Sequence, residues 1–187
     1  MIPLVTGMLR YYANDFVAAI SLLQEARVSF KVSGDRVNEF HANEYLTMVS
    51  IADNDFTKAL HQAKQLVIIG EKLKEGSEGP FANALHAFCQ YALGEDKVSI
   101  MQYLDELRVC DAKHRLAYTL TRTALIDLKN NDFQLAITRV EEALAYTKIL
   151  NRASERMLAL SVLANAKVAL SKDANINESI STSNHKE

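Results

Sequence analysis

Apolar and polar residues alternate along most of the chain at the three-and-four spacing of amphipathic helices. Short polar breaks separate nine such stretches. They cover residues 2–13, 15–32, 36–52, 55–74, 81–93, 96–109, 113–129, 132–150 and 152–170. Ala and Leu, which favour helices, are common in these stretches, and the chain contains only 2 prolines and 6 glycines to form tight turns. The pattern therefore predicts an all-α protein of about nine helices.

One triplet, Asn-Asp-Phe, opens three of these stretches, at residues 14–16, 54–56 and 131–133. An alanine follows three residues after each Phe, at Ala19, Ala59 and Ala136. A degraded copy lies at residues 94–96, with Ile100 in place of the alanine. The aspartates Asp15, Asp55, Asp96 and Asp132 are therefore 40, 41 and 36 residues apart. Recurrence at this interval is typical of stacked helix pairs, in which a single unit cannot bury its own apolar face.

The Asn-Asp pair has a mechanical explanation. Asn tolerates the left-handed conformation that ends a helix, and Asp caps the next helix with its carboxylate. The Phe that follows is expected to point into the groove between paired helices. We therefore interpret each triplet as the hinge of an antiparallel helix pair, and we predict that Asp15, Asp55 and Asp132 are N-caps.

These motifs resemble tetratricopeptide repeats, over residues 2–170. The best copies are residues 54–60 and 131–137, and the later small residue of the second helix matches Ala26 and Ala143. The small residue of each first helix corresponds to Gly7, Thr47, Ala124 and Ala164. The chain departs from the family because the closing proline is missing and the interval is near 40 residues instead of 34. Longer repeats of this kind are similar to those of kinesin light chains and of bacterial transcription activators of the maltose-regulator type.

The resemblance implies a right-handed superhelix formed by residues 1–171, followed by a polar tail at 172–187 that we expect to be mobile. The first helix of each pair would line the concave face, which suits an extended peptide or a partner helix. The residues expected to bind a partner there are His41, Glu44, Met48, Leu85, Cys89, Tyr118, Thr121, Arg122 and Asn165. Plain packing between repeats is the alternative, and it is the stronger interpretation for Met48 and Leu85.

Charge and composition narrow the classes of partner. The chain has 21 basic and 23 acidic side chains and a net charge of −2, so no basic field exists to attract nucleic acid or anionic lipid. No apolar run is long enough to span a membrane, and no signal peptide is evident at the N-terminus. We therefore expect a cytoplasmic protein in which Cys89 and Cys110 are reduced thiols.

No arrangement typical of an enzyme stands out. None of the histidines belongs to an H-E-x-x-H pair, and the phosphate loop, the dinucleotide fingerprint and the nucleophile elbow are absent. His86 and Cys89 lie one helical turn apart, but two ligands alone are a weak indication of a metal site. We therefore expect no metal, no cofactor and no enzymatic activity.

The first hypothesis is a non-enzymatic module that binds a protein or peptide along its concave face. The alternative is an effector-sensing or regulatory segment of a larger bacterial transcription activator or signalling protein. The sequence leaves the identity of the partner and the oligomeric state open.

Overall fold

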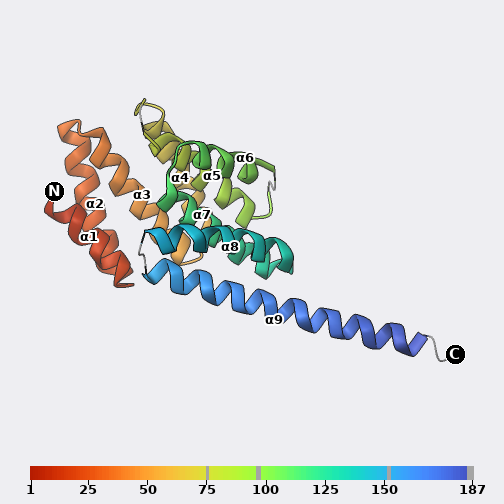
Figure 1. Ribbon diagram of the computed structural model, residues 1–187. Coiled ribbons are helices and arrows are strands. Elements are labelled where there is room, and N and C mark those ends of the chain that lie inside the picture. The colour runs from red at the N-terminus through yellow and green to blue at the C-terminus, as the bar shows by residue number, and fades with distance from the viewer. Residues whose placement is uncertain (75, 96–97, 151–152, 185–187) are drawn as a thin grey trace. The chain divides into compact units, whose positions relative to one another are not determined.

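The computed structural model describes residues 1–187 except 75, 96–97, 151–152 and 185–187, and describes only the backbone of 98–99 and 173–184. Every regular element in the described part of the chain is a helix, which confirms the all-α prediction (Figure 1). The helices are α1 (Ile2–Tyr12), α2 (Phe16–Ser33), α3 (Arg36–Ala52), α4 (Phe56–Gly70), α5 (Glu78–Ala92), α6 (Val98–Val109), α7 (Lys113–Lys129), α8 (Phe133–Ile149) and α9 (Ala153–Asn184).

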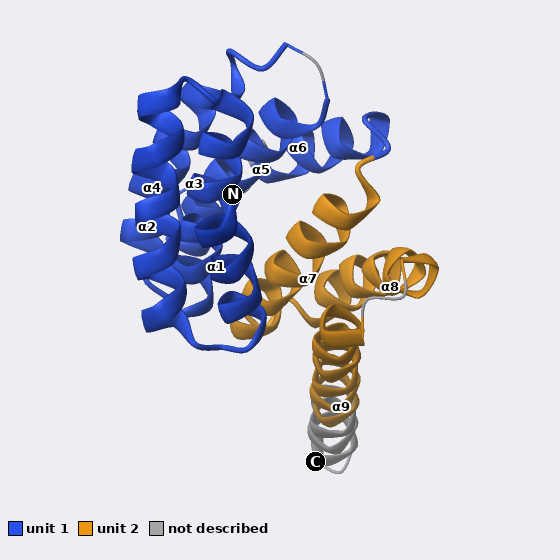
Figure 2. Cartoon of the chain, turned by 90° about the vertical axis from the view of Figure 1, so that its left-hand side faces the viewer, with its two compact units in different colours: residues 1–111 blue, residues 112–187 orange. Residues whose placement is uncertain are grey.

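The helices form two compact units, Met1–Asp111 and Ala112–Glu187 (Figure 2). In the first unit each helix packs against the next, and α3 also contacts α1 and α5. In the second unit α7, α8 and α9 all contact one another. The first helix of a pair thus touches the first helix of the next pair within each unit, as expected for stacked pairs.

A left-handed residue closes the joint before each second helix that opens with the triplet. Asn14, Asn54 and Asn131 have φ angles of 58°, 58° and 63°. The next residue donates its backbone N–H to a carbonyl five residues back, as in the bond from Asp55 to Ser50, which is 3.0 Å long. This is the Schellman closure, which satisfies carbonyls at the helix end. The predicted hinge is therefore confirmed at all three triplets.

Glycine supplies the same conformation at two other joints. Gly34, between α2 and α3, has a φ of 75°, and Gly94, after α5, has a φ of 80°. The N–H groups of Asp35 and Glu95 close these joints with bonds to carbonyls five residues back. The chain therefore uses one turn geometry whether or not the full triplet is present.

The aspartate caps are only partly as predicted. The carboxylates of Asp15 and Asp55 accept hydrogen bonds from the N–H groups of Ala18 and Lys58, at 3.2 and 3.0 Å. Asp35 caps α3 in the same way through the N–H of Asn38, and hydrogen bonds from the Asn38 side chain and backbone lower the pKa of its carboxyl. Asp132 occupies the N-cap position of α8 as predicted, but its carboxylate makes no capping hydrogen bond, so only the position is confirmed there.

We predict that Asp55→Ala lowers the free energy of unfolding by about 1 kcal/mol, because it removes a capping bond. Asp53→Ala is the matched control, since it removes an exposed carboxylate two residues earlier in the same joint, and it should cost clearly less. Urea denaturation of both variants at neutral pH measures the difference. Equal losses would show that the capping bond seen at Asp55 adds nothing.

Small residues allow the helices of each pair to approach closely. Ala19, Ala59 and Ala136, which follow the triplets, are all fully buried. A Cβ placed on Gly7 of α1 would lie 2.8 Å from Cγ of Leu23 on α2. These positions are where larger side chains would collide with the facing helix.

The cluster at the centre of the second unit joins α7, α8 and α9. Its buried members are Ala124, Ala136, Ile137, Val140, Ala159, Val162 and Ala166, and Leu125, Leu128, Leu144 and Leu163 pack against it. Alanines occupy four of these positions, so the three helices meet at short range and leave little room for added volume.

We predict that Ala136→Leu destabilises the protein by about 1–3 kcal/mol through overpacking. Ala145→Leu is the matched control, because Ala145 lies on the same helix but is exposed. Thermal denaturation of the two variants makes the comparison, and a melting curve of Ala136→Leu that matches the control would contradict close helix contact.

Helices α4 and α9 end at residues other than those that the sequence pattern predicts. Helix α4 ends at Gly70, four residues before the predicted end, and α5 begins at Glu78, three residues before the predicted start, which places Pro80 in its first turn. A Cβ on Gly70 would lie 3.1 Å from Cα of Gly79, so a side chain there would press on the backbone at the start of α5. Helix α9 continues past the predicted end at 170 to Asn184. The mobility predicted for residues 172–187 stays a prediction.

None of the described helices combines the length and the apolar character needed to cross a membrane.

Candidate functional site

The nine residues predicted to bind a partner lie on four first helices. His41, Glu44 and Met48 are on α3, Leu85 and Cys89 on α5, Tyr118, Thr121 and Arg122 on α7, and Asn165 on α9. Helices α3 and α5 belong to the first unit and α7 and α9 to the second, so these residues form two sets, one in each unit.

Most of the predicted residues are buried. Leu85, Cys89 and Thr121 have no exposed surface, and Glu44, Met48 and Tyr118 are 5–6% exposed. The remaining three, His41, Arg122 and Asn165, retain surface that a partner can reach. Helices α3, α5 and α7 are buried around most of their circumference, which explains why helical periodicity alone did not separate packing residues from surface residues. The binding role of the nine residues stays a prediction.

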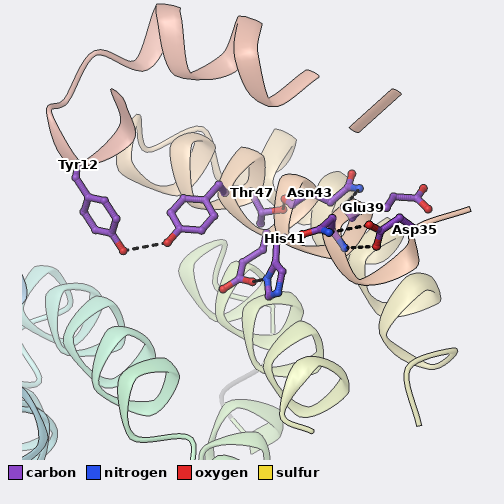
Figure 3. Close-up of polar contacts among 9 residues, drawn as sticks. Tyr12, Asp35, Glu39, His41, Asn43 and Thr47 are labelled. Carbon is purple, nitrogen blue, oxygen red and sulfur yellow. Dashed lines mark hydrogen bonds and ion pairs between the residues drawn. The ribbon is translucent and has the colours of Figure 1, made fainter. Parts of the chain in front are cut away.

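In the first unit, His41 and Glu44 form a hydrogen-bonded pair one turn apart on α3. His41 Nδ1 lies 3.1 Å from Glu44 Oε2 (Figure 3). The Glu44 side chain is 8% exposed, whereas that of His41 is 30% exposed. The histidine therefore connects a buried carboxylate to the surface, and it can offer its outer ring nitrogen to another molecule.

Beside this pair, tyrosines join the first three helices. The hydroxyl of Tyr12 on α1 lies 3.0 Å from that of Tyr45 on α3 (Figure 3). The Tyr11 ring meets the Tyr45 ring edge-on at 5.5 Å and lies 6.2 Å from the ring of Phe16 on α2. Edge-on aromatic pairs add about 0.5–1.5 kcal/mol beyond their burial. Tyr11 and Tyr12 are thus part of the packing between pairs, as expected for an interface between repeats.

In the second unit, Arg122 connects α7 with α9. Its Nη2 lies 3.4 Å from Glu155 Oε1, and its guanidinium lies 4.8 Å from the centre of the Tyr118 ring. The two charged side chains are 14% and 12% exposed. Arg122 therefore holds α7 to α9 and also keeps some exposed surface. A test of its binding role must separate an effect on partner binding from an effect on the α7–α9 contact.

A buried ion pair between Asp127 on α7 and Arg139 on α8 was missed by the sequence analysis. Arg139 Nη1 lies 2.7 Å from both carboxylate oxygens of Asp127. The side chains are 0% and 6% exposed. The backbone carbonyl of Asp127 also accepts the N–H of Asp132, so this residue both closes the joint and ties the pair together. The sequence does contain a sign of this ion pair, because Arg139 stands among the apolar positions of the stretch 132–150.

We predict that Arg139→Met, which leaves Asp127 buried without this partner, costs about 3–5 kcal/mol of unfolding free energy. The double variant Asp127→Leu with Arg139→Met should recover most of that loss, because two apolar side chains replace both charges. Lys148→Met, at an exposed position of α8, controls for the change in charge. The single variant Asp127→Leu completes the comparison. If the double variant loses as much unfolding free energy as the two single variants lose together, the ion pair is not the source of the effect.

His86 and Cys89, whose spacing is a weak indication of a metal site, are half-buried and buried on α5. Burial raises the pKa of Cys89 to about 12, so the thiol by itself stays protonated at neutral pH and is a poor nucleophile. Burial and the nearby Lys64 lower the pKa of His86. Across the described residues, no group of three His, Cys, Asp or Glu side chains is placed to hold a metal ion. Cys89 and the exposed Cys110 are both free thiols.

The surface of the described residues includes two open depressions of similar size. One, of about 450 Å³, lies in the second unit beside the start of α8 and Leu170. The other, of about 440 Å³, lies in the first unit and is lined by Val37, Lys72, Leu73, Lys74 and Glu78. Neither depression contains any of the nine predicted residues.

A scan against protein-family models finds no match, and a search of curated proteins finds no related sequence.

Proposed function

We propose that the chain is a non-enzymatic interaction module of tetratricopeptide-like helix pairs, which binds a peptide or protein through residues of its first helices. The observation that carries this proposal is the recurring joint. A left-handed residue precedes the second helix at each triplet, and first helices of successive pairs touch within each unit. Stacks of this kind present extended surfaces suited to peptides, and the right-handed superhelix is part of the proposal.

The partner would be recognised through the three predicted residues that retain surface. His41 offers a ring nitrogen backed by Glu44, and Arg122 offers a guanidinium backed by the Tyr118 ring. Exposed Asn165 offers both a donor and an acceptor. Each unit thus presents its own set of groups, and each set favours a peptide with carboxylate or backbone carbonyl groups, which accept hydrogen bonds from histidine in the first unit and from arginine in the second.

The proposal is tested with a displayed library of random peptides and the wild-type protein as bait. We expect enriched peptides whose affinity, measured by fluorescence anisotropy, falls about tenfold or more in His41→Ala or Arg122→Glu. The same peptides should not enrich on an unrelated helical protein.

The structural contact of Arg122 is separated by a charge exchange. Arg122→Glu places two carboxylates together, and adding Glu155→Arg restores an ion pair between α7 and α9. Stability should therefore recover in the double variant while peptide affinity stays low. Recovery of both would show that Arg122 acts only in packing, and a library without enriched peptides would contradict the proposed function itself.

A further inference from the structure

Helix α9 exposes an apolar strip on one side. It contacts α7 and α8 through the residues that it contributes to the central cluster. Elsewhere on the helix, Met157, Leu160 and Val168 are 68%, 41% and 56% exposed, and together with the exposed Ala164 they form what we call the α9 stripe. Successive members are three, four and four residues apart, so all four lie on one side of the helix, over about 16 Å of its length.

Basic side chains border the α9 stripe. Arg156 and Lys167 each stand directly before a member of the stripe, so they lie on the same margin, three helical turns apart. Lys172 continues the opposite margin, and all three side chains are exposed. From residue 153 to residue 172 the sequence has one acidic residue, Glu155, and its carboxylate pairs with Arg122. The exposed side of α9 is therefore apolar at its centre and positively charged at its margins.

The charge of the second unit has the same sign. Of the 21 basic and 23 acidic side chains of the chain, residues 112–187 contain 11 and 8, whereas residues 1–111 contain 10 and 15. Lys167 has an acidic neighbour, because its Nζ lies 3.2 Å from Glu141 Oε1 of α8. Both side chains of this pair are more than half exposed, so water weakens their attraction. Lys167 can therefore exchange Glu141 for a carboxylate of another molecule.

We propose that the α9 stripe binds an acidic amphipathic helix of a partner protein. The stripe offers no polar side chain to pair with the backbone of an extended peptide, whereas a helix bonds its own backbone internally and can cover an apolar strip. The small Ala164 lets such a helix approach closely near the middle of the stripe. Carboxylates three turns apart on one margin of the partner helix then meet Arg156 and Lys167.

Charge decides between the candidate occupants. A second copy of this chain, paired through the same stripe, would bring two sets of positive margins together, and like charges disfavour that contact. An acidic helix instead pairs its carboxylates with these margins while its apolar side covers the stripe. None of the nine residues predicted to bind a partner belongs to the stripe, so this surface is additional to the proposed function.

The first experiment measures the binding of designed peptides to the full chain by fluorescence anisotropy. The probe is a helical peptide of about 18 residues, with leucines at three-and-four spacing flanked by glutamates. One control has lysine in place of every glutamate, and another has the same composition in an order without an apolar side. The probe should bind with a Kd of about 10–100 µM, and both controls should bind at least about tenfold more weakly. A probe that does not bind, or a control that binds equally well, would overturn the proposal.

The second experiment places the peptide on α9. Arg156→Glu and Leu160→Ser should each weaken binding of the probe by at least about fivefold, with unchanged helicity because both side chains are exposed. Their matched controls, at exposed positions of the first unit, are Lys64→Glu and Val28→Ser, which should bind the probe like the wild type. Equal losses in a variant and its control would contradict binding at the stripe.

Glu141→Gln supplies the opposite expectation. This variant frees Lys167 from its ion pair, so the probe should bind about twofold more tightly. Weaker binding of the probe to Glu141→Gln would contradict the pairing of its carboxylates with Lys167.

The other occupants are tested with vesicles of phosphatidylglycerol and with the protein alone. The wild type should not sediment with the vesicles, and light scattering at about 100 µM should show one chain. Sedimentation or dimer formation that Leu160→Ser abolishes, without binding of the probe, would assign the stripe to lipid or to a second copy and overturn the proposal. His41→Ala should bind the probe like the wild type, so this result is separate from that of the peptide library.

Discussion

The left-handed residue that ends each first helix of a triplet pair is the constraint on which the rest of the structure depends. At Asn14, Asn54 and Asn131 the backbone reverses within one residue, and the next N–H closes the turn on a carbonyl of the helix just completed. An L-residue pays roughly 1–2 kcal/mol for this conformation, and Asn adopts it more readily than most. The second helix is thereby directed back along the first.

The short reversal determines which residues the interior accepts. Two helices joined by so few residues lie close together, so the facing positions carry small side chains, such as Gly7 against Leu23 and Ala124 in one cluster with Ala136 of α8. The buried ion pair of Asp127 and Arg139 crosses the same joint, and the Asp127 carbonyl also accepts the N–H that closes it. The backbone turn, the close packing and the ion pair therefore all occur at the connection between α7 and α8.

The recurring joints of the fold could be predicted from the sequence, because they need residue types with specific backbone preferences, such as Asn in the left-handed conformation. The Asn-Asp-Phe triplets marked three joints, and the period of 40 residues marked equivalent positions such as Ala124 and Ala164. Asp132 shows the limit of that argument, because an N-cap residue type does not determine whether its carboxylate turns toward the helix. The ends of α4 and α9 were missed because Lys and Ser residues are compatible with both helix and loop.

The candidate site was less predictable. Helical periodicity placed Leu85, Cys89 and Thr121 on the expected faces of first helices, but it could not show that those faces are buried. Burial around a whole helix depends on how many other helices surround it, which one helix's own sequence does not encode.

The role of the left-handed joint is tested most directly by valine substitution at two neighbouring asparagines. Asn130 has a φ of −85° and Asn131 a φ of 63°, and both side chains are exposed. Urea denaturation should show that Asn131→Val loses about 1–2 kcal/mol of unfolding free energy, whereas Asn130→Val loses clearly less and Asn131→Gly loses nothing. Equal losses for the two valine variants would contradict the account.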